Sequence, residues 1–120
     1  MDQPNRFQRL VADAKRNIKE ISPNEARTQS ERGDAVLIDL REDSDWQEGH
    51  ARGASHLSRG EIELEIEEEI PDVNQAIICY CGGGSRSALV AKSLQKMGYK
   101  NVRSMAGGLR QWKATGLPTE

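Results

Sequence analysis

The chain is organised around one stretch, Ile77-Ile78-Cys79-Tyr80-Cys81-Gly82-Gly83-Gly84-Ser85-Arg86-Ser87-Ala88-Leu89-Val90-Ala91. It begins as an apolar run typical of a buried strand, turns through three consecutive glycines and continues as a helix. Ser85 or Ser87 is expected near the first turn of that helix. Cys81 therefore stands where a strand ends and a helix begins. The amides of the turn and the positive end of the helix dipole face such a position.

Three features of this turn favour a thiolate at Cys81 and an anionic ligand beside it. They are the inward amides of the Gly82–Gly84 run, the helix N-terminus and the positive charge of Arg86. A free thiol with a pKa of ~8.5 is only about 3% ionised at pH 7, so each feature would raise the ionised fraction. The alternative is a buried cysteine followed by a plain turn, but such a turn seldom needs three glycines, because each carries an entropy cost. We therefore predict that Cys81 is a nucleophile and that Gly82 to Ser87 bind its ligand.

The other cysteine, Cys79, lies inside the strand, and we interpret it as a core residue. The two cysteines make a poor zinc set with His50 and His56, since the usual C-x-x-C pairs are absent, and no metal site is expected. His50 is the candidate acid or base. A structural role, in which His50 hydrogen-bonds its own loop, is favoured over catalysis.

A second buried strand, 35–40, ends at Asp39 and Arg41. These two residues are expected to form a buried ion pair that supports the active loop. Such a pair would hold the loop in position and would take no part in the reaction itself.

Strands alternate with helices along the chain, which predicts an α/β fold with a mainly parallel sheet of about five short strands and helices on both faces. Segment 60–70 gives conflicting signals, because it alternates like a strand yet repeats isoleucine every four residues; its glutamates and Pro71 favour a helix. Sheets of this kind bind ligands at the carboxyl ends of their strands, where Cys81 and Asp39 stand. Strands are predicted at 18–21, 35–40, 55–57, 77–81 and 99–105, and helices at 5–17, 23–32, 42–49, 60–70, 85–97 and 109–115.

Composition narrows the class of protein further. The 120 residues suit one domain, and 17 basic against 19 acidic residues give a net charge of −2, which argues against a general nucleic-acid binder. No window approaches the ~20 apolar residues of a membrane span, so no membrane partner is expected. The polar N-terminus does not resemble a secretory signal, which favours a cytoplasmic location.

Four motifs, in this order, resemble those of the rhodanese (sulfurtransferase) family, and the resemblance extends from Ile21 to Pro118. Val36–Glu42 is similar to a strand ending in Asp-x-Arg, and Glu48–Ala54 to a Gly-His-Ile-x-Gly-Ala turn. Tyr80–Ser87 is similar to a Tyr-Cys-x-x-Gly-x-Arg-Ser loop. Gly107–Trp112 with Gly116–Pro118 is similar to Gly-Gly-x-x-x-Trp with Gly-x-Pro. The resemblance implies a single rhodanese domain over residues 19–118. Residues 1–18 lie outside it as an N-terminal extension; the spacing of their apolar residues by three and four predicts an amphipathic helix, which is expected to pack on the core rather than to mediate association.

The resemblance also implies a mechanism. The Cys81 thiolate attacks the outer sulfur of a sulfane donor such as thiosulfate or a polysulfide and becomes a persulfide, which the loop amides and Arg86 hold. A thiophilic acceptor, cyanide or a thiol, then takes the sulfur, and a sulfur-relay protein is a further candidate partner. No metal or organic cofactor is expected.

Two alternatives stay open. Phosphatases and arsenate reductases of the same fold use a loop one residue longer, whereas four residues separate Cys81 from Arg86, a spacing that resembles the sulfur-handling members. Non-catalytic rhodanese-like interaction modules usually lose the cysteine, which this chain retains. Dedicated thiosulfate enzymes often carry cations at the positions of Gly82 and Gly83, so weak affinity for thiosulfate is expected and the physiological donor is left open.

Overall fold

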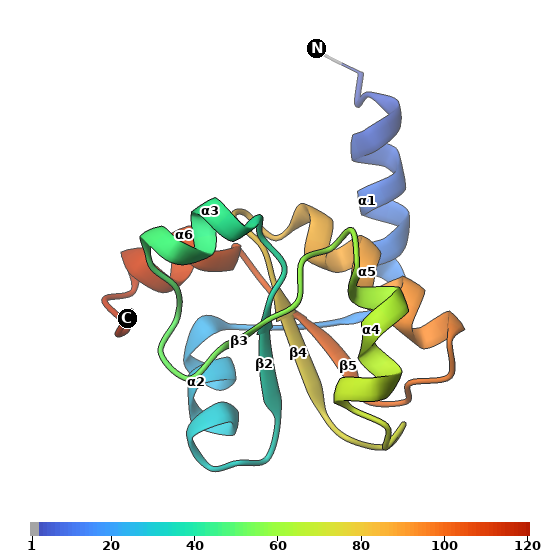
Figure 1. Ribbon diagram of the computed structural model, residues 1–120. Coiled ribbons are helices and arrows are strands. Elements are labelled where there is room, and N and C mark those ends of the chain that lie inside the picture. The colour runs from blue at the N-terminus through green and yellow to red at the C-terminus, as the bar shows by residue number, and fades with distance from the viewer. Residues whose placement is uncertain (1–2) are drawn as a thin grey trace.

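One parallel five-stranded sheet forms the centre of the protein, with the strand order β1-β5-β4-β2-β3 (Figure 1). The computed structural model describes residues 3–120. Strand β4 lies between β5 and β2, so the residues that follow it stand near the middle of the carboxyl edge of the sheet. The strands are β1 (Lys19–Ile21), β2 (Val36–Asp39), β3 (Ser55–His56), β4 (Ile77–Tyr80) and β5 (Val102–Met105).

Six helices within residues 3–120 alternate with these strands and confirm the predicted α/β fold. A capping box begins α2, where Ser22 accepts from the Glu25 amide and the Glu25 carboxylate accepts from the Ser22 amide. None of the helices within residues 3–120 is long and apolar enough to cross a membrane. The helices are α1 (Arg6–Arg16), α2 (Pro23–Glu31), α3 (Asp43–Glu48), α4 (Ile62–Glu69), α5 (Ser85–Lys96) and α6 (Gly108–Ala114).

Each face of the sheet carries its own apolar core. In β4, Ile78 and Tyr80 point to the layer of α2 and α6, where Trp112 is buried. The alternate residues, Ile77 and Cys79, point to the layer of α4 and α5. Because both faces are covered, β4 is apolar throughout rather than alternating.

The ambiguous segment 60–70 is a helix, as its composition favoured. Ile62 and Ile66 are fully buried against the sheet, while Leu64 is 85% exposed. Burial therefore follows the spacing of four, and the strand-like alternation of this segment has no structural counterpart.

Helix α1 packs on α5 rather than on the sheet. Val11 and Ala14 are buried in that contact, and the Lys92 ammonium lies 3.4 Å from the Asp13 carboxylate. The N-terminal end of α1 stands clear of the body of the domain (Figure 1), and Phe7 and Leu10 are about half exposed there. The prediction that this helix packs on the core thus holds for its second half; Met1 and Asp2 of the predicted extension lie outside the described residues.

Candidate active site

Cys81 follows the last residue of β4 and lies on the wall of a cavity of about 420 Å³. Its side chain is only 6% exposed. Gly84, in a left-handed conformation with φ of 96°, begins α5 and donates its amide to the Cys81 sulfur at 3.1 Å. The cavity is also lined by Gly82, Gly83, Ser85 and Arg86.

The surroundings of Cys81 lower its pKa. Burial alone would raise the pKa, but hydrogen bonds from the Ser87 hydroxyl and from the amides of Ser87, Gly84 and Gly83 outweigh burial. The strongest lowering comes from the Ser87 hydroxyl, whose oxygen lies 3.6 Å from the sulfur. Arg86 is exposed on the cavity wall. The amides of Gly83 and Gly84 contribute as the sequence predicted, whereas the amide of Gly82 is not among these groups, and the leading part of a serine hydroxyl was not foreseen.

Ser87 is held by a second serine that sequence reasoning missed. Its hydroxyl lies 2.8 Å from that of Ser104 on β5, and both residues are fully buried. Ser104 can donate to Ser87, which leaves the Ser87 hydrogen free to point at the Cys81 sulfur. A signal in the sequence was a serine within the predicted strand 99–105, because a hydroxyl that is buried in a sheet is nearly always hydrogen-bonded.

The start of α6 supports the Cys81 loop through two backbone hydrogen bonds. The Leu109 amide donates to the Cys81 carbonyl at 2.9 Å, and the Arg110 amide donates to the Gly82 carbonyl at 3.1 Å. A Cβ atom at Gly108, whose φ is +58°, would lie 2.4 Å from the Cys81 carbonyl oxygen. The loop carbonyls are therefore turned toward α6, and only glycine allows this close approach.

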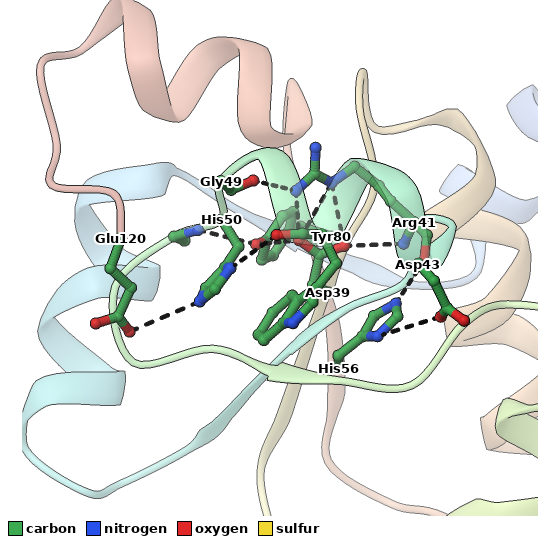
Figure 2. Close-up of polar contacts among 10 residues, drawn as sticks. Asp39, Arg41, Asp43, Gly49, His50, His56, Tyr80 and Glu120 are labelled. Atoms are coloured by element: carbon green, nitrogen blue, oxygen red, sulfur yellow. Dashed lines mark hydrogen bonds and ion pairs between the residues drawn. The ribbon is translucent and has the colours of Figure 1, made fainter.

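An ion pair that includes the cavity-lining Arg41 joins three segments, and Figure 2 shows its contacts. The Arg41 guanidinium binds the buried Asp39 carboxylate, with Nη2 to Oδ2 at 2.9 Å, and also donates to the Gly49 carbonyl at 2.7 Å. The Tyr80 hydroxyl donates to Asp39 at 2.5 Å and accepts from the Ala51 amide at 3.0 Å. Burial, reinforced by Asp39, raises the pKa of Tyr80, so this hydroxyl remains a donor. The predicted ion pair exists, and it reaches the active loop through Tyr80, the residue before Cys81.

His50 lies in a neighbouring loop and does not line the cavity. Its Nδ1 lies 3.1 Å from the Trp46 carbonyl oxygen, and its ring stacks on the Trp46 indole with centroids 3.5 Å apart. The His56 ring is also parallel to this indole, with centroids 4.9 Å apart, and its Nε2 lies 2.6 Å from the Arg41 carbonyl oxygen. The outward nitrogen of each imidazole faces a carboxylate, that of Glu120 or Asp43 (Figure 2). These contacts fit the structural interpretation of His50.

Cys79 has the opposite environment from Cys81. It is fully buried among the apolar side chains under α4 and α5. Burial, and then the nearby Cys81, raise the pKa of Cys79 to about 12, so its thiol stays neutral. Both cysteines are free, and within residues 3–120 no three His, Cys, Asp or Glu side chains are grouped to hold a metal ion.

Several residues outside the loop also line the cavity, and the sequence did not connect them with it. They come from segments far apart in the chain: Phe7 from α1, Glu42 and Asp45 from the start of α3, and Arg59 from the β3–α4 connection. Arg41 lines the cavity too. Arg41 and Glu42 belong to the motif Val36–Glu42, but no local motif identifies Phe7, Asp45 or Arg59, because only the tertiary fold brings these three to the cavity.

The comparisons with known proteins agree with this geometry. The family model of the Rhodanese-like domain matches residues 22–115. Thiosulfate sulfurtransferase GlpE of Haemophilus influenzae is 38% identical over 104 residues, which are 87% of this chain and 96% of that protein. The GlpE protein of Coxiella burnetii is 35% identical over 96 residues, 80% of this chain and 88% of that protein.

Two solved structures are also similar. The polysulfide-sulfur transferase homodimer of Wolinella succinogenes has 29% identity and a TM-score of 0.81, covering 95% of this chain and 86% of that chain. A Rhodopseudomonas palustris protein of unknown function, described as a possible tyrosine phosphatase, has 28% identity and a TM-score of 0.84, covering 100% of this chain and 99% of that one.

The chain therefore belongs to the rhodanese-like domain family, as its motifs indicated. The curated relatives also confirm the predicted class of enzyme, a sulfurtransferase. Helix α1 precedes the residues that the family model matches.

Proposed function

We propose that this protein transfers a sulfane sulfur from a donor to a thiophilic acceptor through a persulfide on Cys81. The observation that carries the proposal is a cysteine with a lowered pKa that lies on an open cavity and accepts a hydrogen bond from a loop amide. A lowered pKa increases the ionised fraction of the thiol, and the thiolate is the nucleophile, so the proposal needs no separate general base. Thiosulfate and polysulfide are the two donor classes that the relatives suggest.

The two half-reactions balance without an external oxidant or reductant. With thiosulfate, the electron pair of the Cys81 thiolate forms a bond to the outer sulfur, the S–S bond of the donor breaks, and sulfite leaves with its electrons. With cyanide, the acceptor carbon attacks the outer sulfur of the persulfide, thiocyanate leaves, and the Cys81 thiolate is restored. A thiol acceptor would instead receive the sulfur as a persulfide.

The residues of the Cys81 loop have different roles in the reaction. The amides of Gly83 and Gly84 and the hydroxyl and amide of Ser87 stabilise the negative sulfur, because hydrogen bonds to an ionised group are the strong ones. Arg86, with Ser85 beside it, meets the anionic donor at the cavity wall.

Three residues support the loop without touching the donor sulfur. Asp39 and Arg41 hold Tyr80 and the Gly49 carbonyl, and His50 holds its own loop against Trp46. Their part in the reaction is to position the groups around Cys81.

The proposal includes the setting of the reaction. Residues 19–118 form the sulfurtransferase domain, residues 1–18 extend it, and a low-molecular-weight thiol or a sulfur-relay protein takes the sulfur. A persulfide enzyme with two free thiols suits a reducing compartment, and we place it in the cytoplasm.

The most informative experiment incubates the protein with thiosulfate and cyanide and, in parallel, with a phosphate ester. We expect thiocyanate production, no ester hydrolysis, and a mass increase of one sulfur atom on Cys81 after treatment with the donor alone. Turnover of the ester alone would favour the phosphatase suggested for the Rhodopseudomonas palustris relative. A chain that gains no sulfur from thiosulfate or polysulfide would be an interaction module.

A further inference from the structure

We propose that two copies of this chain form a closed dimer, in which the groove between α1 and α5 of each copy binds helix α4 of the other. The proposal concerns association, which goes beyond the proposed function and does not depend on the chemistry at Cys81. It is carried by two exposed surfaces, one apolar with a basic edge and the other acidic with an apolar centre.

The first surface, the basic groove, is a hollow of about 280 Å³ between α1 and α5. Leu10 lies there on the apolar side of α1 and is 56% exposed. Asp13 also lines the groove, but its carboxylate is paired with Lys92 at 3.4 Å. Along α1, four cations stand against this one carboxylate, so the groove combines apolar lining with positive charge. The residues that give it this character are Leu10, Ala14, Leu89, Lys92 and Lys96.

The second surface, the acidic face, is the outer side of α4. Leu64 is 85% exposed there, whereas Ile62 and Ile66 on the inner side are fully buried. Segment 61–69 contains six glutamates and no cation, and none of the salt bridges within residues 3–120 includes these glutamates. Burial, and then the negative charge of Glu61, raise the pKa of Glu65, so neighbouring carboxylates repel one another. In both charge and apolar content the acidic face complements the basic groove.

The two surfaces lie on the same side of the sheet, because α4 and α5 cover one face and α1 packs on α5 (Figure 1). A smaller hollow of about 190 Å³ lies between them and is bordered by Phe7 of α1, Glu63 of α4 and Leu89 of α5. Leu89 lines the basic groove as well. Since each copy presents both surfaces side by side, a two-fold axis between two copies can bring each basic groove onto the acidic face of the other. Such an interface is self-complementary and closes at two copies.

Docking of this kind buries apolar area and pairs charges in the same step. Leu64 of each copy leaves water and contacts Leu10 and Leu89 of the other. The glutamates beside Leu64 face Lys96 and the cations of α1, and complementary charge fixes the orientation of an interface. Phe7 lines both the smaller hollow and the Cys81 cavity, so pairing also holds the half of α1 that borders this cavity.

Sedimentation equilibrium tests the association directly. At ~100 μM we expect a mass twice that of one chain, which falls on dilution and on addition of salt, because salt screens the charge pairs. Leu64→Ala should weaken the dimer at least about tenfold, because this side chain is buried once in each half of the interface. Val73→Ala is the matched control: Val73 is another exposed apolar residue, outside both surfaces, and its loss should not change the dimer.

An exchange of charges tests the pairing of the two surfaces. Arg6→Glu/Lys96→Glu puts carboxylates at the basic groove, and Glu61→Lys/Glu68→Lys puts ammonium groups on the acidic face. Each variant alone should associate at least about tenfold more weakly, because attraction becomes repulsion in both halves of the dimer. An equimolar mixture of the two variants should restore the dimer, because the altered groove then binds the altered helix and the unaltered groove binds the unaltered helix.

Arg32→Glu/Lys113→Glu controls for the change in net charge. It makes the same two reversals at exposed residues next to α2 and in α6, on the other side of the sheet, and should leave the dimer intact. Circular dichroism should show the same helix content in every variant, so loss of association cannot be assigned to misfolding.

The proposal fails if the unaltered chain has the mass of a single chain at the higher concentration, or if it forms masses beyond two chains. It also fails if the mixed variants associate no better than each does alone, since the two surfaces would then not be partners. None of these results affects the proposed function, because persulfide formation on Cys81 is measured separately with the donor.

Discussion

Cys79 and Cys81 are separated by one residue and have opposite environments. Cys79 is part of β4, points into the apolar layer under α4 and α5, and has its pKa raised to about 12 by burial. Cys81 lies just beyond the strand, where amides and a serine hydroxyl outweigh the effect of burial and lower its pKa. Both residues are mostly buried, so burial alone does not explain the difference between their pKa values. The hydrogen-bond donors around each sulfur decide it.

Replacing each cysteine in turn tests this difference most directly. Cys81→Ser should abolish sulfur transfer from thiosulfate to cyanide, whereas Cys79→Ser should retain most of it. The second variant should instead lose about 1–3 kcal/mol of unfolding free energy, because a serine hydroxyl is buried among apolar side chains. Activity assays and urea denaturation measure the two effects. Equal loss of activity in both variants would contradict a single nucleophile.

The next largest effect concerns the support behind Cys81. Gly108→Ala should lower the unfolding free energy by roughly 3–5 kcal/mol and slow persulfidation more than tenfold, because its Cβ would collide with the Cys81 carbonyl oxygen. Gly116→Ala is the matched control: its φ is +81°, but no heavy atom lies within 4 Å of the added Cβ, so it should cost only about 1–2 kcal/mol. A Gly108→Ala protein with normal activity would show that the position of α6 is unimportant to the loop.

A third experiment tests what lowers the pKa of Cys81. Ser87→Ala should slow alkylation of Cys81 by iodoacetamide about tenfold at pH 7, because the thiolate loses its strongest donor. Its rate should reach that of the unaltered protein at alkaline pH, where both thiols are ionised. Ser93→Ala, on the same helix, should leave the profile unchanged. A Ser87→Ala profile that matches the unaltered one would mean that the amides alone stabilise the thiolate.

The same lowered pKa affects stability. Because the pKa of Cys81 is lower in the folded chain than in the unfolded chain, the thiolate stabilises the fold above the unfolded pKa. This contribution is lost as the pH falls through the folded pKa. Denaturation across that range should show a smaller stability gain toward alkaline pH in Cys81→Ala.

The smallest effect is expected at Arg86. Arg86→Gln should change the alkylation rate of Cys81 less than threefold, because Arg86 is exposed on the cavity wall and its charge is screened by solvent. The KM of Arg86→Gln for an anionic donor should rise by more than this factor of about three. A rise in the alkylation midpoint as large as that of Ser87→Ala would show that the charge of Arg86, and not the hydroxyl, controls the thiolate.

Local patterns were enough to predict the sheet, the helices and the position of Cys81. The buried run of β4, the capping box at Ser22 and the glycine turn are each determined by neighbouring residues. The predicted strand 99–105 is shorter in the structure and begins at Val102. Tyr99 does not pair in the sheet, because its ring is buried and its hydroxyl donates to the Ile70 carbonyl.

The missing parts of the candidate site depend on long-range contacts. Ser104 meets Ser87 only because β5 pairs with β4, and Phe7 reaches the cavity only because α1 packs on α5. The sequence could not predict the short distance between Gly108 and Cys81 either, although it contains both glycine motifs. A motif identifies the residues that recur in a family but does not say which of them touch.

The contact between the two glycine turns also limits how the enzyme can be engineered. Gly84 and Gly107 meet so closely that a Cβ atom at Gly84 would lie 3.0 Å from the Gly107 nitrogen. A loop one residue longer, as phosphatases of this fold use, has to bulge either into the cavity or into this contact. Converting the protein to phosphate chemistry by insertion therefore requires a redesigned 106–108 turn as well, so the Cys81 loop and the α6 turn must be exchanged together as one unit.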